Sequence, residues 1–133
     1  MNAVFADTSF YVALFSSSDV HHEKAVRFSA EIHRPVVVTA FVLLELANAL
    51  CDSRSRHIFS QLFPHLISNP NVSIVLASQE LLHKGFDLYA QRPDKDWSLT
   101  DCTSFVVMQQ QGLTDALTSD HHFEQAGFNV LLK

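Results

Sequence analysis

The sequence predicts an α/β fold, with a five-stranded parallel sheet covered by helices on both faces. Five short apolar segments, of which residues 36–38 are all β-branched, alternate along the chain with amphipathic helical segments. This alternation is typical of parallel strands, whose connections cross over the sheet as helices. A length of 133 residues and an apolar content of 47% are sufficient for a single domain over residues 1–133 with a buried core.

The strands and helices can be placed in order from apolar runs, caps and turn residues. Ser78 and Ser98 are expected to cap helix starts, and Gly112 is expected to end a helix. Pro64 predicts a kink or a break in its helix. The predicted strands cover residues 3–6, 36–38, 72–76, 116–118 and 129–132. The predicted helices cover residues 10–15, 22–33, 39–51, 54–67, 79–91, 99–111 and 121–126.

Several expectations concern which side chains are buried. The helix over residues 79–91 is expected to turn four side chains inward: Leu81, Leu82, Phe86 and Tyr89. The helix before it carries three apolar side chains that are expected to be exposed and could join two copies of the chain: Phe59, Leu62 and Phe63. The two cysteines, Cys51 and Cys102, lack metal-binding or CxxC spacing and are expected to be small buried thiols.

The charge balance limits the classes of function. The net charge is −5 and there is no lysine-rich run, so contact with a nucleic acid must be local or mediated by a metal ion. The chain shows no signal peptide and no apolar stretch long enough to span a bilayer. The expected location is therefore the reducing cytoplasm, with no membrane association.

Four carboxylates stand among apolar neighbours: Asp7, Glu45, Asp101 and Asp120. A half-buried carboxylate is costly unless it finds a donor or a cation, and none of the nine Lys and Arg residues lies beside these positions in the sequence. Asp7 and Asp120 each follow a predicted strand, and the carboxyl ends of parallel strands meet at one edge of a sheet. If the four acids converge there, their repulsion calls for a divalent ion, Mg²⁺ or Mn²⁺. The sequence therefore points to metal-dependent phosphodiester chemistry.

Each acid also has a simpler explanation. Asp7, Asp101 and Asp120 stand near helix starts, where an acid caps free N–H groups. Glu45 lies in the middle of a helix, where capping does not apply, although it could line a polar edge together with Asn48. Four hydroxyl residues beside the acids could hold metal-bound water or phosphate oxygens, or could serve as ordinary helix-start residues: Thr8, Ser9, Thr100 and Ser119.

Other polar residues carry weaker signals. Arg54, Arg56 and His57 form one compact basic patch, which is either a candidate RNA contact or a solvated helix face. Asp96 and Asp115 are expected in solvated loops. The pairs 21–22 and 121–122 lack the i, i+4 spacing of a helical zinc site, so zinc is not predicted.

Two groups of motifs carry a family resemblance. Residues 7–9, 13–14, 22–25, Thr39 and 44–50 resemble the PIN-domain nucleases. Residues 96–102 and 116–128 are similar to VapC-type toxins of toxin–antitoxin pairs. The segments occur in the expected order and cover essentially the whole chain.

The resemblance implies a three-layer α/β/α sandwich with a five-stranded parallel sheet. It also implies an Mg²⁺- or Mn²⁺-dependent endoribonuclease that cleaves RNA, such as tRNA, by metal-activated water. Asp7 and Asp101 are implied as the main metal ligands, with Glu45 and Asp120 completing the site directly or through water. Implied partners are a second copy of the chain in a homodimer and a cognate antitoxin that blocks the site.

Two other functions can be compared with this one. A catalytically silent PIN-like domain would bind only a partner protein or RNA, with its acids acting as helix caps. A phospho-acceptor signalling domain shares the sheet layout but requires an acidic pair after the first strand, and Thr8 follows Asp7 here.

Overall fold

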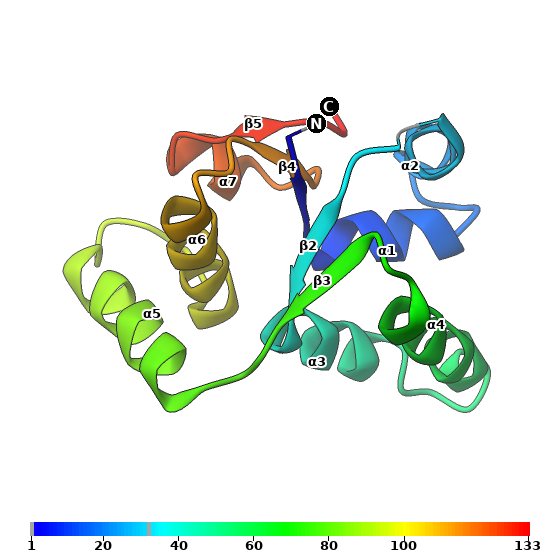
Figure 1. Ribbon diagram of the computed structural model, residues 1–133, viewed down its shortest axis with the longest axis horizontal. Helices are drawn as coiled ribbons and strands as arrows, with labels where there is room; N and C mark the ends of the chain where they lie inside the picture. The colour runs from blue at the N-terminus through cyan, green and yellow to red at the C-terminus, as the bar shows by residue number, and fades with distance from the viewer. Residues whose placement is uncertain (1, 32) are drawn as a thin grey trace.

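The computed structural model describes residues 2–31 and 33–133, and its sheet has five parallel strands in the order β3-β2-β1-β4-β5 (Figure 1). The predicted α/β fold is confirmed. The strands are β1 (Val4–Ala6), β2 (Val36–Thr39), β3 (Val72–Val75), β4 (Asp115–Leu117) and β5 (Asn129–Val130).

Helices cover both faces of this sheet (Figure 1). Helices α1, α2 and α4 lie on one face, α6 lies on the other with α5 packed outside it, and α3 lies by the carboxyl ends of the strands. The predicted helix over 22–33 is α2, which ends at Glu31, and residue 32 lies outside the described residues. The helices are α1 (Thr8–Phe15), α2 (His22–Glu31), α3 (Ala40–Ala49), α4 (Arg56–Ser68), α5 (Gln79–Gln91), α6 (Leu99–Gln111) and α7 (His121–Gln125).

The order of the strands creates a switch point beside β1. The chain runs from β1 outward through β2 to β3, then returns to pair β4 with the other side of β1, where Phe5 lies opposite Ala116. At such a point the connections after two neighbouring strands leave in opposite directions, which opens a crevice at their carboxyl ends. Asp7 and Asp120 follow these two strands.

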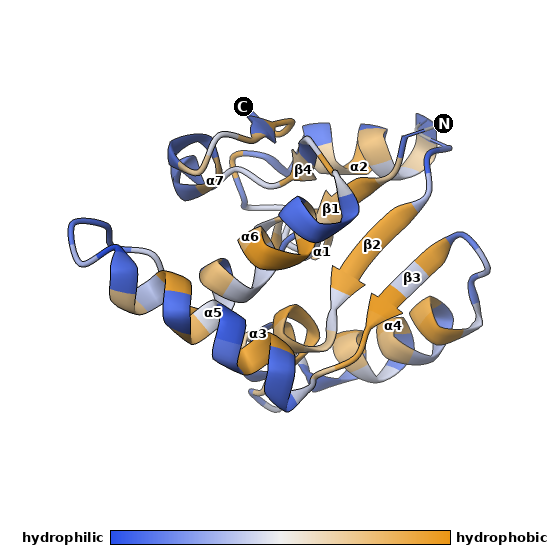
Figure 2. Ribbon diagram, turned by 60° about the vertical axis from the view of Figure 1, so that its left-hand side comes forward, coloured by the Kyte–Doolittle hydropathy of each residue, from blue (hydrophilic) through white to orange (hydrophobic). Residues whose placement is uncertain are grey.

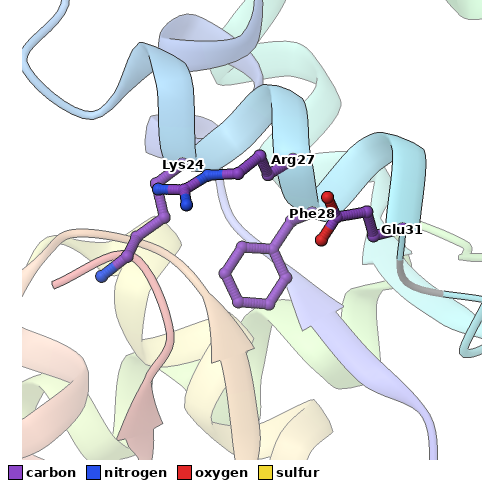
Figure 3. Close-up of a pocket in the computed structure, with 4 residues that line it drawn as sticks. All are labelled: Lys24, Arg27, Phe28 and Glu31. Carbon is purple, nitrogen blue, oxygen red and sulfur yellow. The ribbon is translucent and has the colours of Figure 1, made fainter.

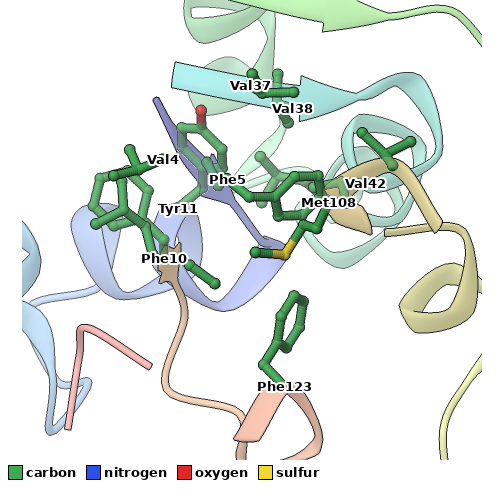
Figure 4. Close-up of a cluster of buried hydrophobic side chains, with 14 of the residues drawn as sticks. Val4, Phe5, Phe10, Tyr11, Val37, Val38, Val42, Met108 and Phe123 are labelled. Carbon is green, nitrogen blue, oxygen red and sulfur yellow. The ribbon is translucent and has the colours of Figure 1, made fainter. Parts of the chain in front are cut away.

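The core fills the space between the sheet and its helices. Strand β1 is fully buried, as expected for the central strand of a parallel sheet, and three of the four residues of β2 are buried. Both strands are largely apolar (Figure 2). Phe5 contacts the ring of Phe123 from α7, and Met108 and Val42 pack close to them (Figure 4). This packing holds α7, and with it the segment that carries Asp120, against the central strand.

Local start and stop signals were predicted well. Ser78 and Ser98 cap α5 and α6, each accepting a hydrogen bond from a backbone N–H three residues later. Gly112 ends α6 in the left-handed conformation, with φ of 65°, which costs a glycine no steric strain. The fifth strand is shorter than predicted: its paired residues end at Val130, although the backbone N–H groups of Leu131 and Leu132 still donate to the carbonyls of Ala116 and Thr118.

Pro64 does not split its helix. Helix α4 runs through it from Arg56 to Ser68, starting two residues later than predicted. Pro64 is exposed, so the carbonyl that loses a helical partner is open to water.

Three predictions of burial were wrong. On α5, Leu81 is buried, but Leu82, Phe86 and Tyr89 are 40%, 55% and 49% exposed, because α5 packs on α6 through one narrow face. On α4, Leu62 is buried against the core and Phe59 is partly buried, leaving Phe63 as the exposed member of that predicted set. Cys102 is buried as expected, but Cys51 is exposed because the chain leaves α3 just before it.

Candidate metal centre

Asp7 is the most deeply buried of the four predicted acids, at 5% exposure. It stands at the N-cap position of α1, yet its side chain makes no cap hydrogen bond. Instead its Oδ2 accepts hydrogen bonds from Thr118 Oγ1, at 2.9 Å, and from Ser9 Oγ, at 3.3 Å. The capping role considered for Asp7 is therefore not the one its side chain fulfils.

Glu45 lies on α3 and is half-buried. Thr8 Oγ1, in the first turn of α1, donates a hydrogen bond of 2.6 Å to Glu45 Oε1. This bond joins the helix after β1 to the helix after β2, so it brings Glu45 to the edge of the sheet where Asp7 lies.

Asp101 is buried in the first turn of α6, where it completes a capping box with Ser98. Its Oδ2 accepts a hydrogen bond of 3.1 Å from the Ser98 backbone N–H and lies 3.3 Å from His122 Nδ1. Capping and site formation are thus compatible for this residue, because the cap uses one of its two oxygens.

Asp120 is the N-cap of α7 and is half-buried. Its Oδ1 accepts a hydrogen bond of 2.9 Å from the His122 backbone N–H and lies 3.3 Å from His122 Nδ1. Its own N–H donates to Thr118 Oγ1, at 3.0 Å, which ties the loop after β4 to the hydroxyl that holds Asp7.

The four carboxylates influence one another electrostatically. Burial raises the pKa of Asp7 to about 6, and repulsion by Asp101 and Glu45 adds to this, while the Thr118 hydrogen bond opposes it. Burial also raises the pKa of Asp101, with a further contribution from Asp120. In the described part of the chain, His121 and His122 are the only basic side chains in ion-pair contact with any of the four. The charges are close together and poorly compensated.

The hydrogen bonds leave one oxygen of each acid available. Among the described residues, side-chain and capping donors contact Oδ2 of Asp7, Oε1 of Glu45, Oδ2 of Asp101 and Oδ1 of Asp120. The second oxygen of each carboxylate has no such partner. Donors that fix one oxygen and leave the other open are what an ion site requires of its carboxylates.

The comparison with known proteins places the chain in a family. The sequence profile of the PIN domain matches residues 4–129. The chain belongs to the PIN domain family. This confirms the family that the motifs indicated.

Two known proteins are similar to this chain. VapC20 of Mycobacterium tuberculosis, a 23S rRNA-specific endonuclease, is 29% identical over 125 residues, which cover 94% of this chain and 95% of VapC20. The crystal structure of VapC20, described as a Sarcin-Ricin loop cleaving toxin, superposes with a TM-score of 0.83 at 27% identity, covering 94% of this chain and 95% of that one. FitAcB from Neisseria gonorrhoeae superposes with a TM-score of 0.66 at 18% identity, covering 96% and 95%, and supports the fold alone.

The hydroxyl residues around this PIN domain's acids divide into two groups. Thr8 and Ser9 bond to the acids directly, as given above. Ser119 contributes its backbone N–H, which donates to Ser9 Oγ, and Thr100 contributes its carbonyl oxygen, which accepts from Thr103. The predicted side-chain roles of Thr100 and Ser119 have no hydrogen bond to support them in the described residues.

Two residues of the site were missed by the sequence analysis. Thr118 is fully buried and contacts Asp7 across 111 positions of sequence, and His122 contacts two of the acids. Their position in the segment after β4, which was already singled out for Asp120, was the available signal.

The remaining polar predictions lie away from the acids. Arg54, Arg56 and His57 are exposed at the start of α4, and the Arg56 guanidinium donates to the Cys51 carbonyl. Asp96 is exposed as predicted. Asp115 is not in a loop: it begins β4 at the opposite end from Asp120 and pairs with Arg34 at 2.8 Å, and hydrogen bonds from Asn129 and Arg34 lower its pKa.

Two hollows on the other side of the molecule are not this site. One, of about 270 Å³, lies beside α2 and is lined by Lys24, Arg27, Phe28 and Glu31 (Figure 3). A second, of about 360 Å³, lies between α1, α2, α4 and the sheet. Neither is lined by any of the four acids.

Within the described residues, every helix is too short or too polar to cross a bilayer.

The residues at the sheet edge suit a hard divalent cation. Carboxylate oxygens are the ligands that Mg²⁺ and Mn²⁺ prefer, and the raised pKa of Asp7 reflects charge that a cation would relieve. In the described residues, the one trio with ligand atoms all within 4.8 Å of one another is Asp120, His121 and His122. No three of the four acids meet that spacing in the described residues.

Proposed function

We propose that this PIN domain, residues 1–133, is a metal-dependent endoribonuclease of the VapC toxin type. The observation that carries the proposal is the set of four carboxylates at the switch point of the sheet, where Asp101 and Glu45 repel Asp7, and Asp120 repels Asp101. The similarity to VapC20 over nearly the whole of both chains supports the reaction class. Helix capping accounts for Asp101 and Asp120 but leaves Asp7 and Glu45 unexplained, which disfavours a catalytically silent domain.

Each acid has a definite part in the proposed reaction. Asp7 and Asp101 hold the ion, Mg²⁺ or Mn²⁺, while Glu45 and Asp120 reach it directly or through water. When bound, such an ion activates water and neutralises charge on the phosphoryl group under attack. The protein's contribution is orientation, since Thr118 and the Ser98 N–H hold the carboxylates of Asp7 and Asp101 in place.

The proposed substrate is structured RNA. The site itself is acidic, so it repels phosphate until a cation is bound, and RNA binding at this edge should depend on the ion. VapC20 acts on 23S rRNA, which makes the sarcin–ricin loop the first candidate to test for this chain, with tRNA as the second.

Cleavage of total cellular RNA with mapping of the new 5′ ends tests the proposal. Reactions contain Mg²⁺, Mn²⁺ or EDTA, and a parallel set uses Asp7→Asn. The expected result is a small number of discrete ends that require a metal ion and the wild-type protein, and their positions separate rRNA from tRNA as the target. Ends that persist in EDTA, or that Asp7→Asn produces at the wild-type rate, would contradict the proposal.

The proposed partners and setting follow from the toxin class. A small cognate antitoxin would block the site, and the cytoplasm, where structured RNA is found, would be the place of action. We also propose a homodimer. Its support in the structure is the exposed apolar stripe of α5, defined by Leu82, Phe86 and Tyr89.

A further inference from the structure

His122 lies between two of the four acids. Its Nδ1 is 3.3 Å from Asp101 Oδ2 and 3.3 Å from Asp120 Oδ1. The side chain is 19% exposed, so water competes little for this nitrogen. The contact with Asp101 is a hydrogen bond, whereas the contact with Asp120 is an ion-pair contact only. Because a carboxylate oxygen only accepts hydrogen bonds, Nδ1 carries the hydrogen and donates it to Asp101 Oδ2. His122 thereby joins α6, which carries Asp101, to α7.

We propose that His122 is a positioning residue for the metal site: its Nδ1–H donates to one oxygen of Asp101, lies against one oxygen of Asp120, and so directs the other oxygens of both toward the ion. The inference rests on the proposed function. Asp101 and Asp120 repel each other. The positive end of the Nδ1–H dipole lies close to both and reduces this repulsion from within the protein.

The contacts of His122 distinguish a positioning role from a packing role. Its backbone N–H already caps α7 through Asp120, so the cap does not need the ring. The ring's other close neighbour is His121, with ring centroids 4.4 Å apart. A packing role would be served by any side chain of similar size, whereas the positioning role requires an N–H donor at the place of Nδ1.

The test measures Mn²⁺ binding by electron paramagnetic resonance on the full chain, which needs no RNA cleavage. His122→Ala removes the donor, and His122→Asn restores an N–H near the place of Nδ1. We expect His122→Ala to weaken Mn²⁺ binding about 10- to 100-fold, the usual effect of losing a partner that orients a metal ligand. His122→Asn should recover most of the affinity. His83→Ala, an exposed histidine on α5, is the matched control and should bind as the wild type does.

Each outcome decides the inference. Wild-type affinity in a folded His122→Ala would overturn it while leaving the proposed function intact. Equal losses in His122→Asn and His122→Ala would also overturn it, as would an equal loss in His121→Ala, which would indicate direct binding by Asp120, His121 and His122. If circular dichroism shows that His122→Ala does not fold, the Mn²⁺ affinities of His122→Asn and His122→Gln are compared instead. The Gln amide reaches past the place of Nδ1, so His122→Gln should bind Mn²⁺ more weakly than His122→Asn. A wild-type protein that binds no Mn²⁺ would overturn this inference and the proposed function together.

Discussion

Asp7 stands at the N-cap position of α1, but its side chain makes no N-cap hydrogen bond. Thr118 and Ser9 hold one oxygen, and burial leaves the charge with little water to stabilise it. The carboxylate is therefore costly in the metal-free protein, as expected for a group that we propose binds a cation.

Replacing Asp7 by Asn should stabilise the metal-free protein. The folded pKa of Asp7 is about 6, above the ordinary 3.8, so this group's contribution to stability is lost as the pH rises from about 4 to about 6. In EDTA at pH 7.5, Asp7→Asn should raise the free energy of unfolding by up to about 3 kcal/mol, and the gain should vanish near pH 4. Urea unfolding at both pH values measures this.

The exposed Asp96→Asn provides the control and should change stability at neither pH. An Asp7→Asn variant that is less stable than wild type at pH 7.5 would show that the buried carboxylate is already compensated, contrary to the electrostatic account.

Residue-level prediction of the acids rests on unusual local context. Asp7, Glu45, Asp101 and Asp120 were singled out because each stands among apolar neighbours, and their role in metal binding stays a prediction. The contacts of Thr118 and His122 depend on which strands become neighbours, and the exposure of Cys51 depends on where α3 ends. Local sequence could therefore indicate neither those contacts nor that exposure.

At the scale of elements, α5 shows where helical periodicity misleads. Its apolar side chains cover more than one face, but the helix meets one neighbour, α6, so Leu81 is buried while the α5 stripe is not. The close approach of α5 to α6 passes over Gly85. A Cβ at this position would lie 2.5 Å from Thr103 Cγ2 and 3.2 Å from the Thr103 backbone nitrogen.

Gly85→Ala should therefore destabilise the protein by about 1–3 kcal/mol, although Ala is the better helix former. Thermal or urea unfolding measures the change. Ala90→Gly, at an exposed position of the same helix, is the matched control and should cost about 1 kcal/mol. Adding Thr103→Ser, which removes Cγ2 and keeps the hydroxyl, should recover part of the loss. A stabilised Gly85→Ala would mean that α5 and α6 are not packed this closely.

Helix caps and the glycine end of α6 were easier to predict than packing. The Ser98 capping box depends on residues within four positions of one another, and so does the glycine end of α6. Pro64 was misjudged because its cost depends on whether the unpaired carbonyl meets water, which is a property of the surface and not of the local sequence.

At the scale of the whole molecule, strand order determines whether the acids form one site. The sequence predicts parallel strands and places acids after them, but it does not state that β4 pairs with β1. That pairing puts Asp7 and Asp120 after neighbouring strands, and the Thr8–Glu45 bond adds α3.

The α5 stripe predicts the state of association. The wild-type chain should run as a dimer in size-exclusion chromatography with light scattering at micromolar protein, at twice the 14.9 kDa of one chain. Phe86→Lys should give a folded monomer, because Phe86 is 55% exposed and no core contact is lost. Val20→Lys, 89% exposed in the α1–α2 connection, should remain a dimer. A wild-type monomer would exclude the homodimer, and a Phe86→Lys dimer would exclude this surface.

A crystal structure with Mn²⁺, read from its anomalous difference map, tests the shared metal site most directly. The account predicts a strong peak bounded by the carboxylates of Asp7 and Asp101, with Glu45 and Asp120 in contact directly or through water. A map with no peak at this edge of the sheet, or with its strongest peak at Asp120, His121 and His122 alone, would contradict it.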